Sequence, residues 1–175
     1  MRRLTDAELI RSFMRALHRH ANVAARVYFT GGATAVLLDW RPTTIDIDVR
    51  WEPDHDELFR ALPLIKEDLQ VNVELAWPFD FIPEPPGWRD RCQFITAEGR
   101  LQFFHCDLYA QALAKIERGH AQDRDDVATM LRTGLVEPAE LRRLFESIEA
   151  QLYRYPAIDP RSFRHALDEA VEPAG

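Results

Sequence analysis

The stretch from Arg26 to Arg50 constrains the fold most, because it combines two strands, a glycine turn and a short helix. Residues 27–30 predict a buried strand, and the apolar run 33–39 predicts a short helix. Between them, Gly31-Gly32 predicts a turn too tight for side chains, here called the diglycine turn. Such a turn brings backbone N–H groups close to whatever lies above the start of the helix, and an anion such as a triphosphate suits that place. The stretch therefore predicts a phosphate-binding turn.

The second strand of this stretch, predicted over residues 44–50, carries two carboxylates. Its residues alternate, so Asp46 and Asp48 lie on one face and the apolar residues between them lie on the other. Two carboxylates on one face repel each other unless a cation lies between them, and Mg²⁺ takes oxygen ligands of this kind. A metal site beside a phosphate-binding turn predicts phosphoryl or nucleotidyl transfer. The alternative is a glycine turn followed by two surface aspartates on an edge strand.

This pattern resembles the polymerase-beta-type nucleotidyltransferase superfamily, whose signature is a Gly-Gly or Gly-Ser turn, a helix and Asp-x-Asp on the next strand. Gly31-Gly32 and Asp46-Ile47-Asp48 carry the resemblance. The likeness is greatest to minimal nucleotidyltransferases and to AbiE-type (abortive-infection) toxin-like proteins of bacteria. It implies an α+β nucleotidyltransferase fold, with a mixed sheet of about five strands flanked by helices. We expect the nucleotidyltransferase core over residues 1–106 and a C-terminal helical extension, packed on the core, over residues 107–175.

The resemblance also implies the roles of individual residues. Asp46 and Asp48 are expected to hold the metal, Mg²⁺ or Mn²⁺. Gly31, Gly32 and Thr34 are expected to contact a nucleoside triphosphate such as ATP. The substrate and the metal would then meet between the diglycine turn and the two aspartates.

Superfamily members commonly draw a third carboxylate from the strand that follows Asp-x-Asp. Residues 70–76 alternate as a strand, with Val71 and Val73 on one face and Glu74 on the opposite face. Glu74 is therefore the candidate for a third metal ligand or a general base. The alternative is a surface glutamate on a half-buried strand.

A second chemical cluster lies on two predicted helices that begin at Asp107 and near Asp123. Lys115, Arg118, Asp123 and Asp126 resemble the second half of the AbiE-type pattern. The resemblance implies that Lys115 contacts the phosphates of the nucleotide and that Asp123 supports the site. A fixed ammonium would stabilise the negative charge that builds on departing pyrophosphate. The alternative is a solvent-facing lysine and two aspartates that cap a helix.

Other segments predict the rest of the fold. Thr5-x-x-Glu8 predicts a capping box that opens a helix ending near Asn22. Four basic side chains of that helix form a face that could contact a phosphate backbone, although most such faces are simply solvated: Arg11, Arg15, His18 and Arg19. The remaining predictions are a helix over 54–69 that Pro63 kinks or ends, a packed aromatic loop over 77–87, a hairpin of strands 92–96 and 101–105, and helices over 137–152 and 160–170.

Charge and composition narrow the function classes. The net charge of −7 opposes general binding to nucleic acid, so any such binding needs a local basic face. Cys92 and Cys106 lack metal-ligand spacing and are expected to be reduced thiols. The basic N-terminal segment lacks the apolar core of a signal peptide, and no apolar run approaches a membrane span. We expect a cytoplasmic protein that does not bind membranes.

Three functions remain open from the sequence. The first is an enzyme that moves a nucleoside monophosphate from a triphosphate to a hydroxyl of RNA, such as a tRNA 3′ end, of a protein or of a small molecule. The toxin-like resemblance implies a role in a toxin-antitoxin or phage-defence system, with a cognate antitoxin protein as partner. The second is a catalytically inactive interaction or antitoxin module with the same fold. The third is a nucleic-acid-binding protein that uses the basic face of its first helix.

Overall fold

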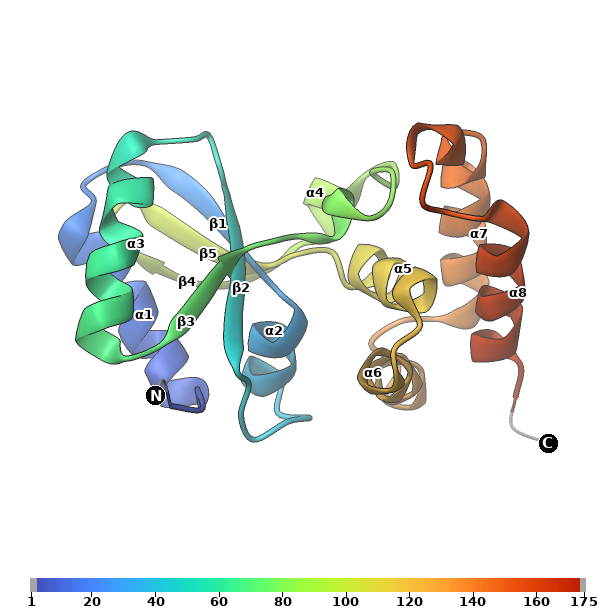
Figure 1. Cartoon of the computed structure of the whole chain (residues 1–175), viewed down its shortest axis with the longest axis horizontal. Helices are drawn as coiled ribbons and strands as arrows, with labels where there is room; N and C mark the ends of the chain where they lie inside the picture. Colours follow the sequence, from blue (N-terminus) through green and yellow to red (C-terminus); the bar gives the residue numbers. More distant parts are fainter. Residues whose placement is uncertain (1–2, 174–175) are drawn as a thin grey trace. The chain divides into compact units, whose positions relative to one another are not determined.

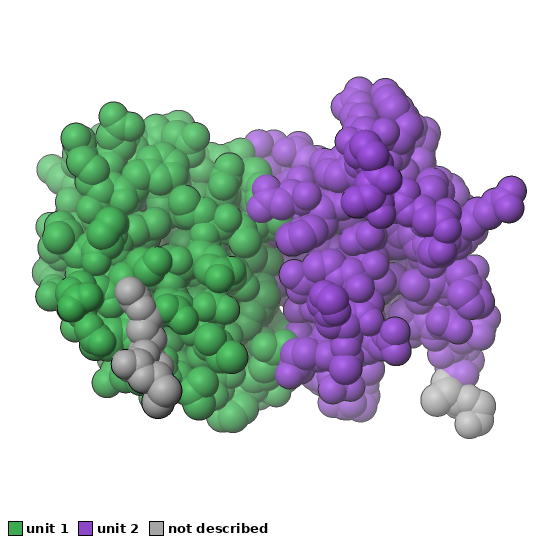
Figure 2. All heavy atoms as spheres, in the orientation of Figure 1, with its two compact units in different colours: residues 1–77, 93–106 green, residues 78–92, 107–175 purple. Residues whose placement is uncertain are grey.

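The structure is a computed structural model that describes residues 3–173. Met1 and Arg2, the start of the basic N-terminal segment, lie outside the described residues. The chain divides into two compact units (Figure 2). The first comprises residues 1–77 and 93–106, and the second comprises residues 78–92 and 107–175. Residues 78–92 thus group with the helical second unit, although strands of the first unit precede and follow them.

Within residues 3–173, five strands form one mixed sheet, in the order β3-β2-β1-β5-β4 (Figure 1). The strands are β1 (Ala25–Thr30), β2 (Asp46–Glu52), β3 (Asn72–Leu75), β4 (Gln93–Glu98) and β5 (Leu101–His105). β1 is central, with β2 antiparallel on one side and β5 parallel on the other. β3 runs parallel to β2, and β4 runs antiparallel to β5. This arrangement confirms the predicted α+β class, the five strands and the hairpin.

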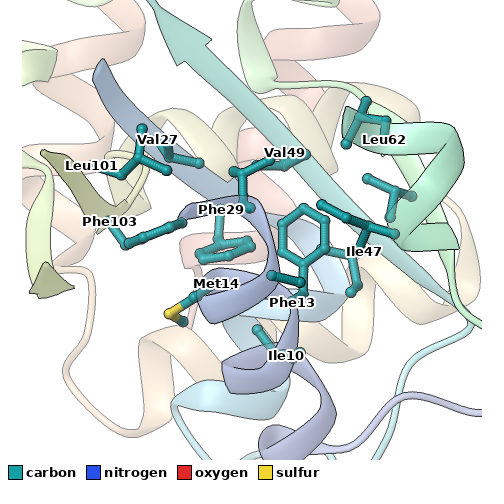
Figure 3. Packing of buried hydrophobic residues seen from close by; sticks show 14 of the residues in the cluster. Ile10, Phe13, Met14, Val27, Phe29, Ile47, Val49, Leu62, Leu101 and Phe103 are labelled. Carbon is teal, nitrogen blue, oxygen red and sulfur yellow. The ribbon is translucent and has the colours of Figure 1, made fainter. Parts of the chain in front are cut away.

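The helices of the first unit are α1 (Ala7–His20), α2 (Gly31–Leu37) and α3 (Asp56–Leu69). α1 and α3 cover one face of the sheet (Figure 1), where the core of the unit lies. Side chains at alternate strand positions, such as Phe29, Ile47 and Val49, meet Ile10 and Phe13 of α1 in that core (Figure 3). Full burial of a side chain of this kind stabilises the fold by about 2 kcal/mol. The residues between them on β1 and β2, including both aspartates, therefore lie on the opposite face.

The predicted capping box at the start of α1 is wrong. Asp6 is the N-cap, and its side chain accepts a hydrogen bond from the Leu9 N–H over 2.8 Å. Thr5 is fully buried and pairs with Thr44 in an isolated antiparallel bridge, with N–H···O distances of 2.8 and 2.9 Å. Asp and Thr are both good N-cap residues, so the local pattern could not tell that tertiary pairing engages Thr5. The pairing of Thr44 also explains why β2 begins at Asp46, two residues later than predicted.

Pro63 does not end α3, which is one helix over Asp56–Leu69. A proline inside a helix costs about 3 kcal/mol, because it removes a hydrogen bond and its ring clashes with the preceding turn. Leu58 and Ile65 of α3 are both fully buried in the core, and their burial offsets this cost. The prediction that Pro63 ends the first part of the helix is therefore wrong.

The second unit is helical. Its elements are η1 (Pro78–Asp80), α4 (Trp88–Arg91), α5 (Leu108–Arg118), α6 (Ala121–Arg132), α7 (Pro138–Glu149), η2 (Leu152–Arg154) and α8 (Pro160–Val171). The predicted boundaries of α5 are confirmed. Asp107 caps its start by accepting from the Tyr109 N–H, and Gly119 ends it with φ of +68°. No helix within residues 3–173 is long and apolar enough to cross a membrane.

Candidate active site

The diglycine turn is the first part of α2, which follows β1 directly at Gly31 and ends at Leu37. The helix predicted over residues 33–39 thus begins and ends two residues earlier than expected, so the two glycines are not a separate turn before it. Gly31 also touches one of the two aspartates. Gly31 has φ of +58°, a backbone conformation that side chains rarely tolerate. A β-carbon added at Gly31 would lie 2.5 Å from Oδ2 of Asp48. The backbone angle strongly favours glycine here, and a larger residue would also have to displace the Asp48 carboxylate. The predicted metal ligand and the predicted phosphate-binding turn are neighbours in space.

The second glycine is required for a different reason. A β-carbon added at Gly32 would lie 2.0 Å from Oγ1 of Thr44, which belongs to the segment leading into β2. Thr44 in turn donates from Oγ1 to the Asp46 carbonyl over 3.2 Å. Gly32 therefore lets the segment before Asp46 pack directly against the turn.

Asp46 and Asp48 lie on one face of β2, as predicted from the alternation, and both are half-buried. The antiparallel pairing of β1 and β2 places Thr30 opposite Asp48. Thr30 is the N-cap of α2, but within the described part of the chain its side chain makes no capping hydrogen bond. Thr30 was not predicted from the sequence as a residue near the site. Its position could have indicated this, because Thr30 is the last strand residue before the two glycines.

Glu74 is the neighbour of Asp48 on β3. The two strands run parallel with Asp48 and Glu74 in register, and residues in register share a face of the sheet. Glu74 is exposed, whereas Asp48 is half-buried. Within residues 3–173, no three His, Cys, Asp or Glu side chains come close enough together to hold a metal ion. The three carboxylates are thus not gathered into one ligand set, and a catalytic role for Glu74 stays a prediction.

Thr34 follows the diglycine turn in the first turns of α2 and is fully buried. Its hydroxyl donates to the Phe29 carbonyl over 3.3 Å and lies 3.1 Å from Nδ1 of His105. Burial lowers the pKa of His105 from its ordinary value of 6.5 to about 4, so the ring is neutral at neutral pH. The direct nucleotide contact predicted for Thr34 stays a prediction. No local pattern predicts the contact of Thr34 with His105, which lies 71 residues away in the chain.

The second cluster is a buried ion network of the second unit. Nζ of Lys115 lies 2.8 Å from Oδ2 of Asp126 and 3.6 Å from Oδ1 of Asp123. Arg118 donates to the same Asp123 oxygen over 2.7 Å. Lys115, Asp123 and Asp126 are each at most 5% exposed. The structure therefore brings together the residues that the AbiE-type pattern suggested, and it shows that the two aspartates bind cations rather than merely cap α6.

Two features of this network, as described over residues 3–173, could matter for ligand binding: an unpartnered carboxylate oxygen and a pocket beside Lys115. Within the described residues, Oδ2 of Asp123 is buried without a hydrogen-bond partner. Lys115 lines a pocket of about 340 Å³ together with Arg124 of α6 and Glu169 of α8. A buried carboxylate oxygen without a donor is costly, so it marks a place where a donor from water or a ligand would be favourable. The lysine is accordingly buried and paired, but it borders a cavity.

The first unit therefore offers hard oxygen ligands next to a side-chain-free turn. Mg²⁺ is usually bound by one or two carboxylates, with phosphate oxygens and water in its other positions. Asp46 and Asp48 supply carboxylates of this kind, and Asp48 lies against Gly31. The donor set therefore fits a magnesium ion beside the diglycine turn.

Comparison with known proteins agrees with this geometry. The sequence matches one protein family over residues 7–168, which is most of the chain, and that family is described as "nucleotidyltransferase of unknown function (DUF6036)". The match includes the diglycine turn, both aspartates of β2 and the ion network of α5 and α6. Searches of curated proteins and of solved structures each found no match to the chain. The chain belongs to the DUF6036 family of nucleotidyltransferases.

Proposed function

We propose that the protein is a Mg²⁺-dependent nucleotidyltransferase that moves a nucleoside monophosphate from a nucleoside triphosphate to a hydroxyl acceptor. The observation that carries this proposal is the position of the Asp48 carboxylate against Gly31. A metal ligand and a phosphate-binding turn must be adjacent for one ion to touch both the protein and the triphosphate. Membership of a nucleotidyltransferase family supports the same reaction class.

Asp46 and Asp48 would hold the metal, Mg²⁺ or Mn²⁺. When bound, the ion would polarise the phosphate oxygens and offset negative charge on the reacting groups. The chain's own contribution is to fix two carboxylates on the rigid backbone of β2. Glu74, in register with Asp48, is the candidate for a third ligand or for the base that accepts the proton of the hydroxyl acceptor.

The diglycine turn would bind the β- and γ-phosphates through its backbone. α2 has only seven residues, so we assign binding to close approach of the main chain rather than to a long helix dipole. Lys115, with Asp123 as its support, is our candidate for contact with the departing pyrophosphate. Lys115 borders a pocket that Arg124 and Glu169 also line, so a ligand in that pocket would lie beside the lysine.

The acceptor is a hydroxyl of RNA such as a tRNA 3′ end, of a protein or of a small molecule. The resemblance to AbiE-type proteins supports a toxin controlled by a cognate antitoxin protein. We place the reaction in the cytoplasm, because nucleoside triphosphates and each of these acceptors occur there.

The test is incubation of the protein with each of the four labelled nucleoside triphosphates, Mg²⁺ and total cellular RNA and protein. We expect label to move to one acceptor class, with loss of transfer when the metal is chelated. Asp46→Asn and Asp48→Asn should each lower kcat/KM by about 100-fold or more, because a carboxylate ligand is lost. Glu52→Gln is the matched control, since Glu52 lies on the same face of β2 and an amide can still accept from the Tyr28 hydroxyl.

Calorimetry with the same nucleotides distinguishes the enzyme from an inactive module of the same fold. An enzyme of this kind shows heat of nucleotide binding that requires Mg²⁺ and disappears in Asp48→Asn. An interaction or antitoxin module shows no metal-dependent heat. Transfer that is unchanged in both aspartate variants would rule out the proposed reaction.

A further inference from the structure

The residues between Phe29 and Thr34 form a closed loop, because a hydrogen bond joins the two ends of the segment. The Thr34 hydroxyl donates to the Phe29 carbonyl over 3.3 Å, and the enclosed residues include the whole diglycine turn. The same carbonyl accepts from the Cys106 N–H over 2.8 Å, at the end of the β1–β5 ladder. The Phe29 carbonyl, just before the turn, therefore accepts hydrogen bonds from two separate segments, which hold it in place.

His105 holds the Thr34 hydroxyl from a third element. β5 runs parallel to β1 with His105 in register with Phe29, and Nδ1 of His105 lies 3.1 Å from Oγ1 of Thr34. When the hydroxyl donates to the Phe29 carbonyl, its contact with His105 is a hydrogen bond if Nδ1 carries the ring hydrogen. A neutral ring with hydrogen on Nδ1 satisfies all three groups, and the lowered pKa of His105 keeps the ring neutral at neutral pH.

Two adjacent glycines need such an external restraint. Glycine has more backbone conformations available than any other residue, so a diglycine segment left to itself samples many shapes. Gly31 adopts φ of +58° and in this conformation lies against the Asp48 carboxylate. A turn that is already in its binding shape loses less conformational entropy when a ligand binds.

We propose that Thr34 and His105 are positioning residues for nucleotide transfer, which hold the diglycine turn in the shape that accepts a triphosphate beside Asp48. This inference rests on the proposed function. Both side chains are buried, at 0% and 4% exposure, so they act through the turn. Ala33, which follows the two glycines, offers no hydroxyl to a phosphate. The two side chains would therefore act on the shape of the backbone that meets the triphosphate.

The experiment measures kcat and KM for the nucleoside triphosphate in variants that remove or keep each hydrogen bond. Thr34→Val keeps the shape of the side chain but removes the hydroxyl, and Thr34→Ser keeps the hydroxyl. His105→Leu removes the donor, and His105→Asn keeps an N–H near the position of Nδ1. We expect Thr34→Val and His105→Leu to raise KM about tenfold or more, because the turn is misplaced. The two conservative variants should stay within about twofold of the unmodified protein.

Ile65→Val controls for a merely structural role. It removes one methyl group from the core under α3, far along the chain from the turn, and costs stability without touching the network. All variants are assayed at a temperature where circular dichroism shows them folded. If KM in Ile65→Val rises as much as in Thr34→Val, the effect is general destabilisation and the positioning role is overturned.

The outcomes also separate this inference from the proposed function. Transfer by the unmodified protein, its loss in Asp48→Asn and an unchanged KM in Thr34→Val and His105→Leu would overturn the positioning role alone. Absence of metal-dependent transfer in the unmodified protein would overturn the proposed function, and the inference with it. A KM that is raised in Thr34→Val and His105→Leu but near the unmodified value in Thr34→Ser and His105→Asn would support both.

Discussion

The Asp48 carboxylate occupies the space beside Gly31, with Oδ2 2.5 Å from the position that a β-carbon at residue 31 would take. The Asp48 carboxylate thus occupies the volume that a side chain at residue 31 would need. Gly31 also lies at a φ of +58° that other residues rarely adopt.

Gly31→Ala should destabilise the protein and abolish nucleotide transfer. The left-handed backbone costs an alanine about 1 kcal/mol, and the contact with Asp48 adds to that cost. Gly134→Ala is the matched control, because Gly134 has φ of +72° but a β-carbon there would have its nearest neighbour at 4.0 Å. Urea unfolding should show a larger loss of stability for Gly31→Ala. Equal losses in both variants would mean that Asp48 does not crowd the turn.

Stability should fall on mild acidification because of His105. Its pKa is about 4 in the folded protein and about 6.5 when unfolded, so between these values the unfolded chain binds a proton that the native ring does not. The contribution of the buried ring is fully present above pH 6.5 and is lost as the pH falls toward 4. The difference corresponds to about 3 kcal/mol. In His105→Asn, unfolding free energies measured from pH 7.5 to 4.5 should lack this component of the decline.

Asp126→Asn should destabilise the second unit by about 3 kcal/mol, because it leaves the Lys115 ammonium buried with less compensation. Lys115→Met combined with Asp126→Leu should cost less than the sum of the single changes, since neither charge is then left alone. A double-mutant cycle followed by urea unfolding measures this coupling. Strict additivity would show that the 2.8 Å contact between the two residues contributes no coupling energy.

Arg91→Ala should destabilise the protein more at pH 7 than at pH 4. Arg91 donates from Nε and Nη2 to one oxygen of Asp107, whose side chain is fully buried. Burial already raises the pKa of Asp107 although Arg91 opposes that effect, so loss of Arg91 should raise the pKa further. A raised carboxyl pKa favours the folded state at low pH and disfavours it as the pH rises through the folded value.

The measurement for Arg91 is the unfolding free energy of the variant and of the unmodified protein at both pH values. Arg143→Ala is the control, because Arg143 pairs with Glu140 on the exposed surface of α7 and such pairs contribute little. A loss that is the same at pH 4 and pH 7 would show that Arg91 acts through packing alone.

Local pattern predicted the part of the site that depends on one strand and one turn. The period of two along β2 is enough to place Asp46 and Asp48 on one face. The helix after β1 was predicted too, but it begins at Gly31 rather than Ala33, because the first glycine enters the helix with φ of +58°. The ends of α5 followed from Asp107 and Gly119 for the same reason, since capping is a property of a few neighbouring residues.

The rest depends on contacts between distant segments. His105 reaches Thr34 only because β5 lies beside β1, and nothing in the residues around His105 specifies that neighbour. Thr5 was predicted to cap α1, but its pairing with Thr44 competes with that role. Pro63 lies inside a continuous helix because burial of the other helix face offsets its cost. In each case the outcome depends on a tertiary contact that the neighbouring residues in the sequence do not specify.

The central position of β1 has a consequence for synthesis of the chain on the ribosome. One of its two neighbours is β5, which ends at His105, so the sheet lacks its parallel partner until that residue has been translated. Residues 78–92, which belong to the other unit, leave the ribosome before β4 and β5 do. The nascent first unit therefore carries an unpaired strand edge during that interval, when chaperones or neighbouring nascent chains can reach it.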